Sequence, residues 1–257
     1  MNLELLGKQV LITGGSKGIG FSSARALLAE GAKVVIVSRD QWNVDKAVER
    51  LPGIRGFTAD LVSAQAADEV VEKIERELGP IDILVNCAGA ARRTPADELR
   101  PAHWRAAMDA KFFSYINVID PLIKRMALRG SGVIINVIGA GGKVASPIHL
   151  PGGSANAALM LATAGLANAF ASRGVRVVGV NPGSTETERL AEGLQAEAAV
   201  AGFSVVEAKA RALERIPLGR MAKPEDIADM IAFLSSARAS YVTGVMINMD
   251  GAATPVI

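Results

Sequence analysis

The chain has 257 residues, of which 50% are apolar and 21% are charged, and its formal net charge at pH 7 is +2. This length and composition are those of an ordinary globular protein with one large core, so we predict a single domain over residues 1–257. Lysine and arginine are interspersed with aspartate and glutamate and form no basic stripe. A nucleic-acid partner is therefore not expected.

The sequence contains no evident targeting signal or metal-ligand motif. Residues 1–8 lack the basic region and apolar core of a signal peptide, and no apolar run approaches the length of a membrane span. We therefore expect a cytoplasmic protein without a membrane partner. Cys87 is the single cysteine, and His103 and His149 form no ligand motif, so neither a disulfide nor a metal site is expected.

A glycine-rich stretch, residues 13–20, follows the apolar run 10–12 and precedes a helical pattern that starts at Phe21. This order predicts a strand that passes through a glycine turn into a helix, as in dinucleotide-binding units. Glycine lets main-chain N–H groups approach a pyrophosphate closely, and the helix N-terminus adds a partial positive charge. We interpret the stretch as a phosphate cradle, and a plain tight turn is the alternative.

Strand and helix alternate along nearly the whole chain. Apolar and β-branched runs predict about seven strands, at residues 10–12, 33–38, 54–58, 81–85, 132–138, 175–181 and 245–248. Helical patterns occur at residues 21–28, 64–78, 101–129, 154–173, 188–215 and 227–235. Pro121 is expected to bend the long helix, because proline removes a helix hydrogen bond. The alternation predicts a doubly wound, mostly parallel sheet with helices on both faces.

Ligands of such sheets bind beyond the carboxyl ends of the strands. Four segments are expected to converge there, namely residues 13–20, 38–39, 86–89 and 139–153. The helical segment 188–215 is loosely amphipathic, and we expect it to cover a substrate.

Further short motifs follow the glycine turn at ordered positions: Asp60-Leu61, Asn86-Cys87-Ala88-Gly89, Asn181-Pro182-Gly183 with Thr187, Pro217-Leu218-Gly219-Arg220, Pro224-Glu225-Asp226-Ile227-Ala228 and Asp250-Gly251. With these motifs the chain resembles the short-chain dehydrogenase/reductase family over essentially its full length. The resemblance implies a single Rossmann-type domain that binds a dinucleotide. The expected cofactor-binding residues are Gly14, Ser16, Lys17, Gly18, Ile19, Gly20, Ser38, Arg39, Asp60, Leu61, Asn86, Ala88, Gly89, Pro182, Gly183, Thr185 and Thr187.

By this resemblance Asp60 lies near the adenine, and Asn86, Ala88 and Gly89 lie along the adenosine ribose. Thr185 and Thr187 lie near the nicotinamide amide and the phosphates. Each position also has a structural interpretation: Asp60 could simply end a strand, and Thr187 could cap the helix that follows it.

The end of the second predicted strand indicates which cofactor is bound. A dehydrogenase that uses NAD(H) usually has a carboxylate there, which accepts hydrogen bonds from the ribose and would repel a phosphate. Here Ser38 and Arg39 occupy this end, and Lys17 lies in the glycine turn. Two cations and a hydroxyl suit a 2′-phosphate, so we predict NADP(H) over NAD(H). The alternative is that Arg39 is a solvated surface charge.

The family's catalytic positions hold unusual residues here. The family has a serine after the fifth strand, a Tyr-x-x-x-Lys motif on the next helix and an asparagine on the long helix before them. Aligned on neighbouring residues, this sequence has Gly139, Gly152, Asn156 and Lys111 at the Ser, Tyr, Lys and Asn positions, respectively. The resemblance is thus to a divergent member that lacks the usual Ser-Tyr-Lys triad.

Lysine and asparagine have exchanged places in this alignment. In the family the two side chains approach each other under the nicotinamide ribose, so the exchange would keep one ammonium and one amide in the pocket. Lys111 and Asn156 are therefore candidate catalytic residues, and the alternative is that Lys111 is a solvated helix residue. His149, which we expect to titrate near neutrality, is the first candidate for the proton donor. Tyr115, one helical turn after Lys111, is the second, and an exposed histidine and a core tyrosine are the alternatives.

Two functions fit the sequence. The first is an NADP(H)-dependent oxidoreductase that acts on a carbonyl or alcohol substrate, a small molecule that the sequence does not identify. The second is a catalytically inactive NADP(H)-binding protein, either a redox sensor or a structural subunit. The resemblance also implies a homo-tetramer or homo-dimer paired through residues 101–128 and 154–173, where Leu161, Leu166 and Phe170 lie either in the interface or in the core.

Overall fold

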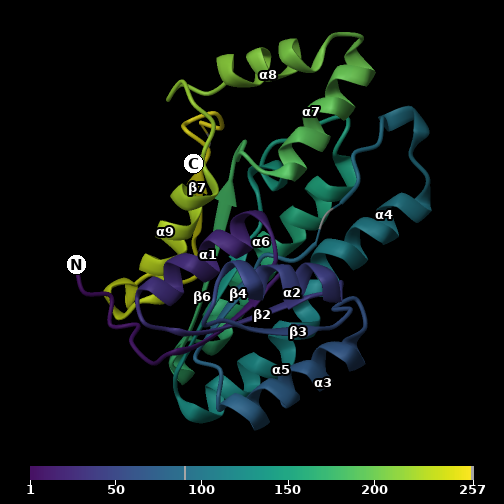
Figure 1. The fold of residues 1–257 in the computed structure, drawn as a ribbon. Helices are drawn as coiled ribbons and strands as arrows, with labels where there is room; N and C mark the ends of the chain where they lie inside the picture. The colour runs from purple at the N-terminus through teal and green to yellow at the C-terminus, as the bar shows by residue number, and fades with distance from the viewer. Residues whose placement is uncertain (90, 256–257) are drawn as a thin grey trace.

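The computed structural model describes residues 1–89 and 91–255, and its centre is one parallel sheet (Figure 1). The seven strands are β1 (Gln9–Thr13), β2 (Lys33–Ser38), β3 (Arg55–Thr58), β4 (Ile83–Asn86), β5 (Gly132–Val137), β6 (Val175–Pro182) and β7 (Met246–Met249). They lie in the order β3-β2-β1-β4-β5-β6-β7, and every pairing is parallel. The predicted single-domain Rossmann-type fold is thereby confirmed.

The strand order reverses beside β1, which pairs with β2 on one side and with β4 on the other. The chain builds outward from β1 to β3 and then returns to start the other half of the sheet at β4. Such a switch point leaves a crevice at the carboxyl ends of the two central strands. Thr13 and Asn86 end these strands and are partners in the register.

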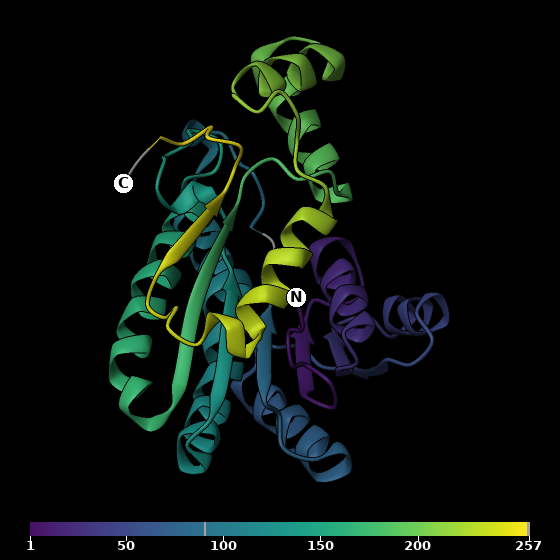
Figure 2. The same ribbon diagram turned by 90° about the vertical axis from the view of Figure 1, so that its left-hand side faces the viewer.

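Helices cover both faces of the sheet (Figures 1 and 2). The α-helices packed in the layers are α1 (Gly18–Ala29), α2 (Gln41–Arg50), α3 (Ala64–Leu78), α4 (Pro101–Ala107), α5 (Ser114–Arg129), α6 (Leu150–Phe170) and α9 (Pro224–Ser235). Short 3₁₀ turns form η1 (Ala96–Glu98), η3 (Ala140–Gly142), η4 (Ala171–Arg173) and η5 (Ala237–Ala239), and η2 (Met108–Phe113) is π-helical.

Alternate residues of each strand pack into two separate cores, because successive side chains of a strand point to opposite faces of the sheet. Val10 and Ile12 of β1 pack in the core under α1 and α9. Leu11 of the same strand packs in the core under α3, α5 and α6. The strands are therefore apolar on both faces, as the continuous β-branched runs of the sequence predict.

Two helices, α7 (Glu188–Ala201) and α8 (Val205–Glu214), project from the layers beyond the carboxyl end of β6 (Figures 1 and 2). They have a small core of their own, formed by Leu194, Ala198 and Ala208. Gly202 ends α7 with φ of +72°, and Ser204 caps α8, so the predicted helical segment 188–215 is two helices. Its role as a cover over the substrate stays a prediction.

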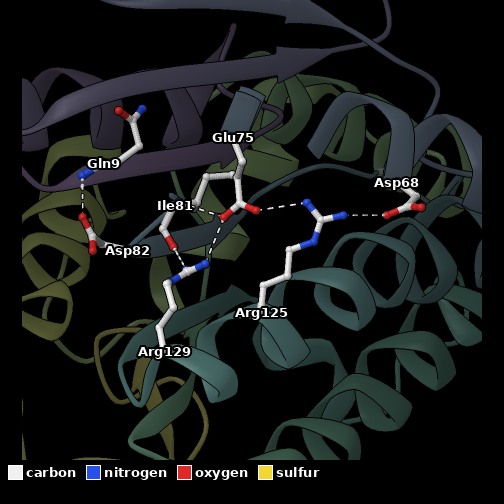
Figure 3. A network of polar contacts seen from close by, with 7 residues as sticks. All are labelled: Gln9, Asp68, Glu75, Ile81, Asp82, Arg125 and Arg129. Carbon is white, nitrogen blue, oxygen red and sulfur yellow. Dashed lines mark hydrogen bonds and ion pairs between the residues drawn. The ribbon is translucent and has the colours of Figure 1, made fainter. Parts of the chain in front are cut away.

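A network of charged residues joins α3 to α5 at the opposite end of the sheet (Figure 3). Glu75 of α3 accepts hydrogen bonds from Arg125 Nη1 at 3.0 Å, from Arg129 Nη1 at 3.2 Å and from the Ile81 amide at 3.0 Å. Arg129 also donates to the carbonyl of Ile81 at 2.7 Å. This network fixes the turn that leads into β4, far along the strand from the crevice.

The structure differs from the predicted elements in three places. The long helix 101–129 loses its α-helical pattern at η2, whereas Pro121 lies inside α5. The helix α2 was not predicted, although Asp40 caps it by accepting from the Asn43 amide at 2.8 Å. The segment Leu150–Arg173 has the length and hydropathy of a membrane span, contrary to the prediction from the sequence. It is α6 with η4, and α6 packs against β6 and η3 as part of the fold.

Candidate active site

The glycine turn lies between the end of β1 and the start of α1. Gly14 and Gly18 have φ of +65° and +52°, in the region that favours glycine. A Cβ atom on Gly14 would lie 2.8 Å from the main chain of Ala88, and one on Gly20 would collide with the carbonyl oxygen of Gly14. The turn thus has no room for side chains, and the N-terminal N–H groups of α1 open at the carboxyl end of the sheet. This geometry fits the pyrophosphate of a dinucleotide.

Several predicted cofactor residues, far apart in sequence, meet at this turn. Ser16 Oγ lies 3.2 Å from Ser38 Oγ at the end of β2. Thr187, just before α7, has its Cγ2 atom 3.3 Å from the position that a Cβ of Gly18 would take. Lys17 Nζ lies 3.4 Å from Glu188 Oε2, so this carboxylate would compete with a phosphate for the ammonium.

The other predicted cofactor residues surround the crevice with varied burial. Arg39 and Asp60 are exposed, and the Asp60 carboxylate accepts from the Val62 amide at 3.2 Å. Thr187 also caps α7 by accepting from the Leu190 amide at 3.3 Å, so it has the structural role considered above. The remaining positions pack beside the two cores or lie at or beyond the carboxyl ends of the strands: Ile19, Leu61, Ala88, Gly89, Pro182, Gly183 and Thr185.

A buried chain of polar side chains runs beneath the crevice. Thr13 Oγ1 donates to Asn86 Oδ1 at 3.2 Å, and Asn86 Nδ2 donates to Asn136 Oδ1 at 3.0 Å. Asn136 Nδ2 in turn donates to Thr163 Oγ1 of α6 at 2.9 Å. These bonds join β1, β4, β5 and α6, and they hold the strand ends that carry the site in a fixed register.

Lys111 lies in the π-helical segment η2 and is 8% exposed. Its Nζ donates to Tyr115 Oη and to the Val137 carbonyl, both at 2.9 Å, and Tyr115 Oη donates to the same carbonyl at 2.7 Å. Burial, and after it the positive charge of Arg189, lower the pKa of Lys111 to about 7, against a weaker opposite effect of Cys87. A lysine in this state exchanges a proton near neutrality, as a general acid or base must.

The hydrogen bond to Val137 holds Lys111 at the carboxyl end of β5. Val137 is the last residue of that strand and lies two residues before Gly139. Tyr115 is wholly buried, and burial raises the pKa of its phenol well above 10, so Tyr115 positions the ammonium and does not itself exchange protons near neutrality. Lys111 is thus not a solvated helix residue. The close approach of η2 depends on Gly89, where a Cβ would collide with the carbonyl oxygen of Ala110.

The imidazole of His149 lies against Gly152. A Cβ on Gly152 would collide with His149 Cε1 and would lie 2.5 Å from Nε2. Gly152 is the residue predicted to stand at the family's tyrosine position, and the ring of His149 fills the space that a side chain there would enter. His149 Nδ1 is buried and has no hydrogen-bond partner among the described residues.

The predicted titration of His149 near neutrality is wrong. Burial, and after it the charges of Arg93, Arg189 and Lys111, lower the pKa of His149 to about 4. The ring is therefore neutral at pH 7 and can accept a proton or a hydrogen bond, but it is not the acid.

Asn156 lies beside the other glycine of the aligned catalytic positions. Its Nδ2 is 3.3 Å from where a Cβ of Gly139 would be, and Gly139 has φ of +122°. The hydrogen bonds of Lys111 go to Tyr115 and Val137, on the other side of the strand end. A direct pairing of Lys111 with Asn156 stays a prediction.

Comparison with known proteins identifies the family. A family model described as short chain dehydrogenase matches residues 8–198. The chain belongs to the short-chain dehydrogenase family. It is 33% identical to the 3-oxoacyl-acyl-carrier-protein reductase FabG of Thermotoga maritima over 97% of this chain and 98% of that protein. It is 32% identical to the gluconate 5-dehydrogenase of Gluconobacter oxydans over 98% of this chain and 96% of that protein.

Solved structures of similar short-chain dehydrogenases include complexes with NADP(H). A gluconate 5-dehydrogenase from Burkholderia cenocepacia, in complex with NADP and tartrate, has a TM-score of 0.90 and 30% identity and covers 100% of this chain and 98% of its own. The actinorhodin polyketide ketoreductase with NADPH has a TM-score of 0.92 and 28% identity over 96% of this chain and 97% of its own. The relatives and solved structures named here are thus reductases and dehydrogenases that match this chain over nearly its whole length.

Sequence reasoning missed two arginines of this short-chain dehydrogenase. Arg189 of α7 donates to the carbonyls of Gly89 at 3.1 Å and Ala91 at 3.4 Å, in the loop after β4. Arg93, in the same loop, places its guanidinium against Gly193 of α7. No motif marks either residue, and the one available signal was the glycine in the second turn of an otherwise regular helix.

Proposed function

We propose that this short-chain dehydrogenase is an NADP(H)-dependent oxidoreductase that reduces a carbonyl group or oxidises the corresponding alcohol, with Lys111 as its proton-transfer residue. The observation that carries the proposal is the buried ammonium at the end of β5, whose pKa of about 7 suits proton transfer. The glycine cradle, together with Ser16 and Ser38, provides the dinucleotide site.

The bound nicotinamide supplies or accepts the hydride. Lys111 Nζ holds two of its three protons in hydrogen bonds to Tyr115 and Val137, which leaves one N–H for the substrate oxygen or for a single bridging water. In reduction Lys111 gives this proton to the oxygen, and in oxidation the neutral amine removes it. The neutral ring of His149 and the amide of Asn156 orient the substrate beside it, and α7 and α8 cover it.

NADP(H) is the proposed cofactor because Ser38 ends β2 and the exposed Arg39 follows it. The carboxylate of Asp40, next in sequence, caps α2 by accepting from the Asn43 amide. The alternative of an inactive nucleotide-binding protein is disfavoured, since the relatives named above are reductases and dehydrogenases over nearly their whole length.

Cofactor choice is tested by titrating the protein with NADPH and NADH. We expect NADPH to bind at least about tenfold more tightly, and Arg39→Ala to lower NADPH affinity about tenfold while leaving NADH unchanged. Lys33→Ala, which removes an exposed lysine at the other end of β2, is the matched control and should change neither. Equal affinities, or an unchanged Arg39→Ala variant, would refute the NADP(H) assignment.

Catalysis is tested by oxidation of NADPH in the presence of ketones, aldehydes and oxo acids. Lys111→Met should bind NADPH within about twofold of the wild type and lose about a hundredfold or more in kcat. Tight NADPH binding by the wild type, without turnover of any carbonyl compound, would favour the inactive nucleotide-binding protein.

A homo-oligomer is part of the same proposal. Leu161 of α6 is 78% exposed, whereas Leu166 and Phe170 pack partly against the core. An exposed leucine on a long alanine-rich helix fits an interface between copies. Light scattering of the wild type and of Leu161→Glu would test it, and a monomeric wild type would contradict it.

A further inference from the structure

Two guanidinium groups share one face of the first turns of α7. Arg189 reaches from α7 to the loop after β4, where it donates to Gly89 at 3.1 Å and to Ala91 at 3.4 Å. Arg93 reaches from that loop back to α7, and its Cζ lies 2.9 Å from the Cβ position of Gly193. Residues 189 and 193 are one helical turn apart and lie on the same face, so both cations lie between α7 and the loop.

These cations have no carboxylate contact. Among the described residues no ion pair includes Arg93, Arg189 or Lys111, whereas the arginines of the network in Figure 3 are paired with Glu75 and Asp68. Desolvation lowers the pKa of Arg189, and the charge of Glu192 acts against this without an ion-pair contact. Lys111 is buried, Arg93 is half-buried and Arg189 is exposed, and their like charges favour an anion bound among them.

The two arginines lie beside the candidate catalytic groups. Ala91, whose carbonyl binds Arg189, has its Cβ 2.8 Å from the Cβ position of Gly152, next to the ring of His149. The Thr94 amide donates to the Ile148 carbonyl at 3.0 Å and joins the loop of Arg93 to the loop of His149. Both arginines act electrostatically on that ring. They therefore lie near His149 and Gly152, on the side of the proposed substrate.

We propose that Arg93 and Arg189 bind a carboxylate of the substrate, so that the substrate is an oxo acid or hydroxy acid and not a neutral ketone or alcohol. This inference rests on the proposed function for the reaction itself. A planar guanidinium matches a carboxylate with two parallel hydrogen bonds. The two arginines would bind the carboxylate at one end of the substrate, and Lys111 would transfer the proton to the carbonyl oxygen at the other end.

The test compares the wild type with Arg93→Met and Arg189→Met on matched substrates. NADPH-dependent reduction is measured with 5-oxogluconate and 4-oxopentanoate, with their neutral counterparts L-sorbose and 2-pentanone, and with a phosphorylated ketose. The acids should have kcat/KM at least about tenfold above the neutral compounds. In each variant the ratio of kcat/KM on the acids to kcat/KM on the neutral compounds should fall by about tenfold to a hundredfold, whatever the variant does to activity on the neutral compounds themselves. Arg92→Met, at the exposed neighbouring position, is the control and should match the wild type.

The outcomes separate the two proposals. Equal use of acids and neutral compounds, unchanged in both variants, would overturn the carboxylate site and leave the oxidoreductase standing. Preference for the phosphorylated ketose, or a weaker NADPH affinity in the variants, would assign the arginines to a phosphate and also overturn it.

A binding measurement does not depend on turnover. Calorimetry with malonate on the NADP⁺-saturated protein should give binding that both variants lose, and malonamide should not bind. If this result holds while no carbonyl compound is reduced, the carboxylate site stands and the oxidoreductase falls. Malonate binding that is unchanged in both variants would overturn the site.

Discussion

Replacing Lys111 with methionine should make the protein more stable at low pH and less active. Burial lowers the pKa of Lys111 from 10.5 to about 7, so the folded state releases this proton between about pH 7 and 10.5 while the unfolded chain keeps it. Within this window the unfolded state binds more protons, and stability therefore rises with pH. Below pH 7 both states are protonated, and the folded state bears the full cost of the buried ammonium.

The magnitude follows from the two pKa values. A change from 10.5 to about 7 corresponds to on the order of 4–5 kcal/mol at about 1.4 kcal/mol for each tenfold change in proton affinity. Methionine keeps most of the apolar volume and loses the hydrogen bonds to Tyr115 and Val137, each worth about 1 kcal/mol. At pH 6 Lys111→Met should thus be more stable by roughly 2–3 kcal/mol, or about 5–10 °C in Tm. Near pH 10 the difference should vanish or reverse.

Thermal unfolding of the two proteins without nucleotide, from about pH 6 to pH 10, measures this difference. Lys33→Met, at an exposed position, is the control and should follow the wild type at every pH. A difference between Lys111→Met and the wild type that does not change with pH would refute the argument, because the ammonium would then be solvated in the folded state.

Three further predictions concern the pH dependence of kcat/KM and the variants Glu75→Gln and Gly89→Ala. In the wild type, kcat/KM for reduction should fall above about pH 7 and kcat/KM for oxidation should fall below it, since Lys111 must be protonated for one and neutral for the other. Glu75→Gln should cost about 1–3 kcal/mol in denaturant unfolding without changing kcat, because it weakens contacts to two arginines far from the site. Gly89→Ala should lower both Tm and kcat, by at least about 2 kcal/mol in stability, since its φ is +92° and its Cβ would collide with Ala110.

The fold could be predicted because its signals are local. Continuous apolar runs mark strands buried on both faces, and the glycine turn marks the first crossover. The helix α2 was also within reach: Asp40 is a good N-cap, and Val44 and Ala47 have helical spacing. The π-helical η2 could not be predicted, because no residue pattern in the sequence marks it; in the structure Ala110 of η2 lies against Gly89.

The candidate site could be predicted from the sequence only in part. The exchange with Asn156 in the alignment made Lys111 a candidate, yet neither its burial nor its hydrogen bond to Tyr115 can be derived from spacing. The pKa of His149 depends on desolvation and on charges up to dozens of residues away in sequence. Arg93 and Arg189 meet only because the loop after β4 folds onto α7, and no periodicity carries that information.

Binding of an acidic substrate should itself raise the pKa of Lys111. After burial, the positive charge of Arg189 is the main cause that lowers this pKa, and a carboxylate bound to Arg189 would cancel that charge. The pH profile of kcat/KM reports pKa values of the free enzyme, and the pH profile of kcat reports those of the enzyme–substrate complex. With an oxo acid the fall of kcat in the reductive direction should therefore lie at higher pH than the fall of kcat/KM, and with a neutral ketone the two should lie closer together. If oxo acids and neutral ketones give the same separation of the two profiles, Arg189 is not where the acid binds. If the separation is larger with acids and disappears in Arg189→Met, the substrate's own charge favours the protonated lysine at the moment reduction needs it.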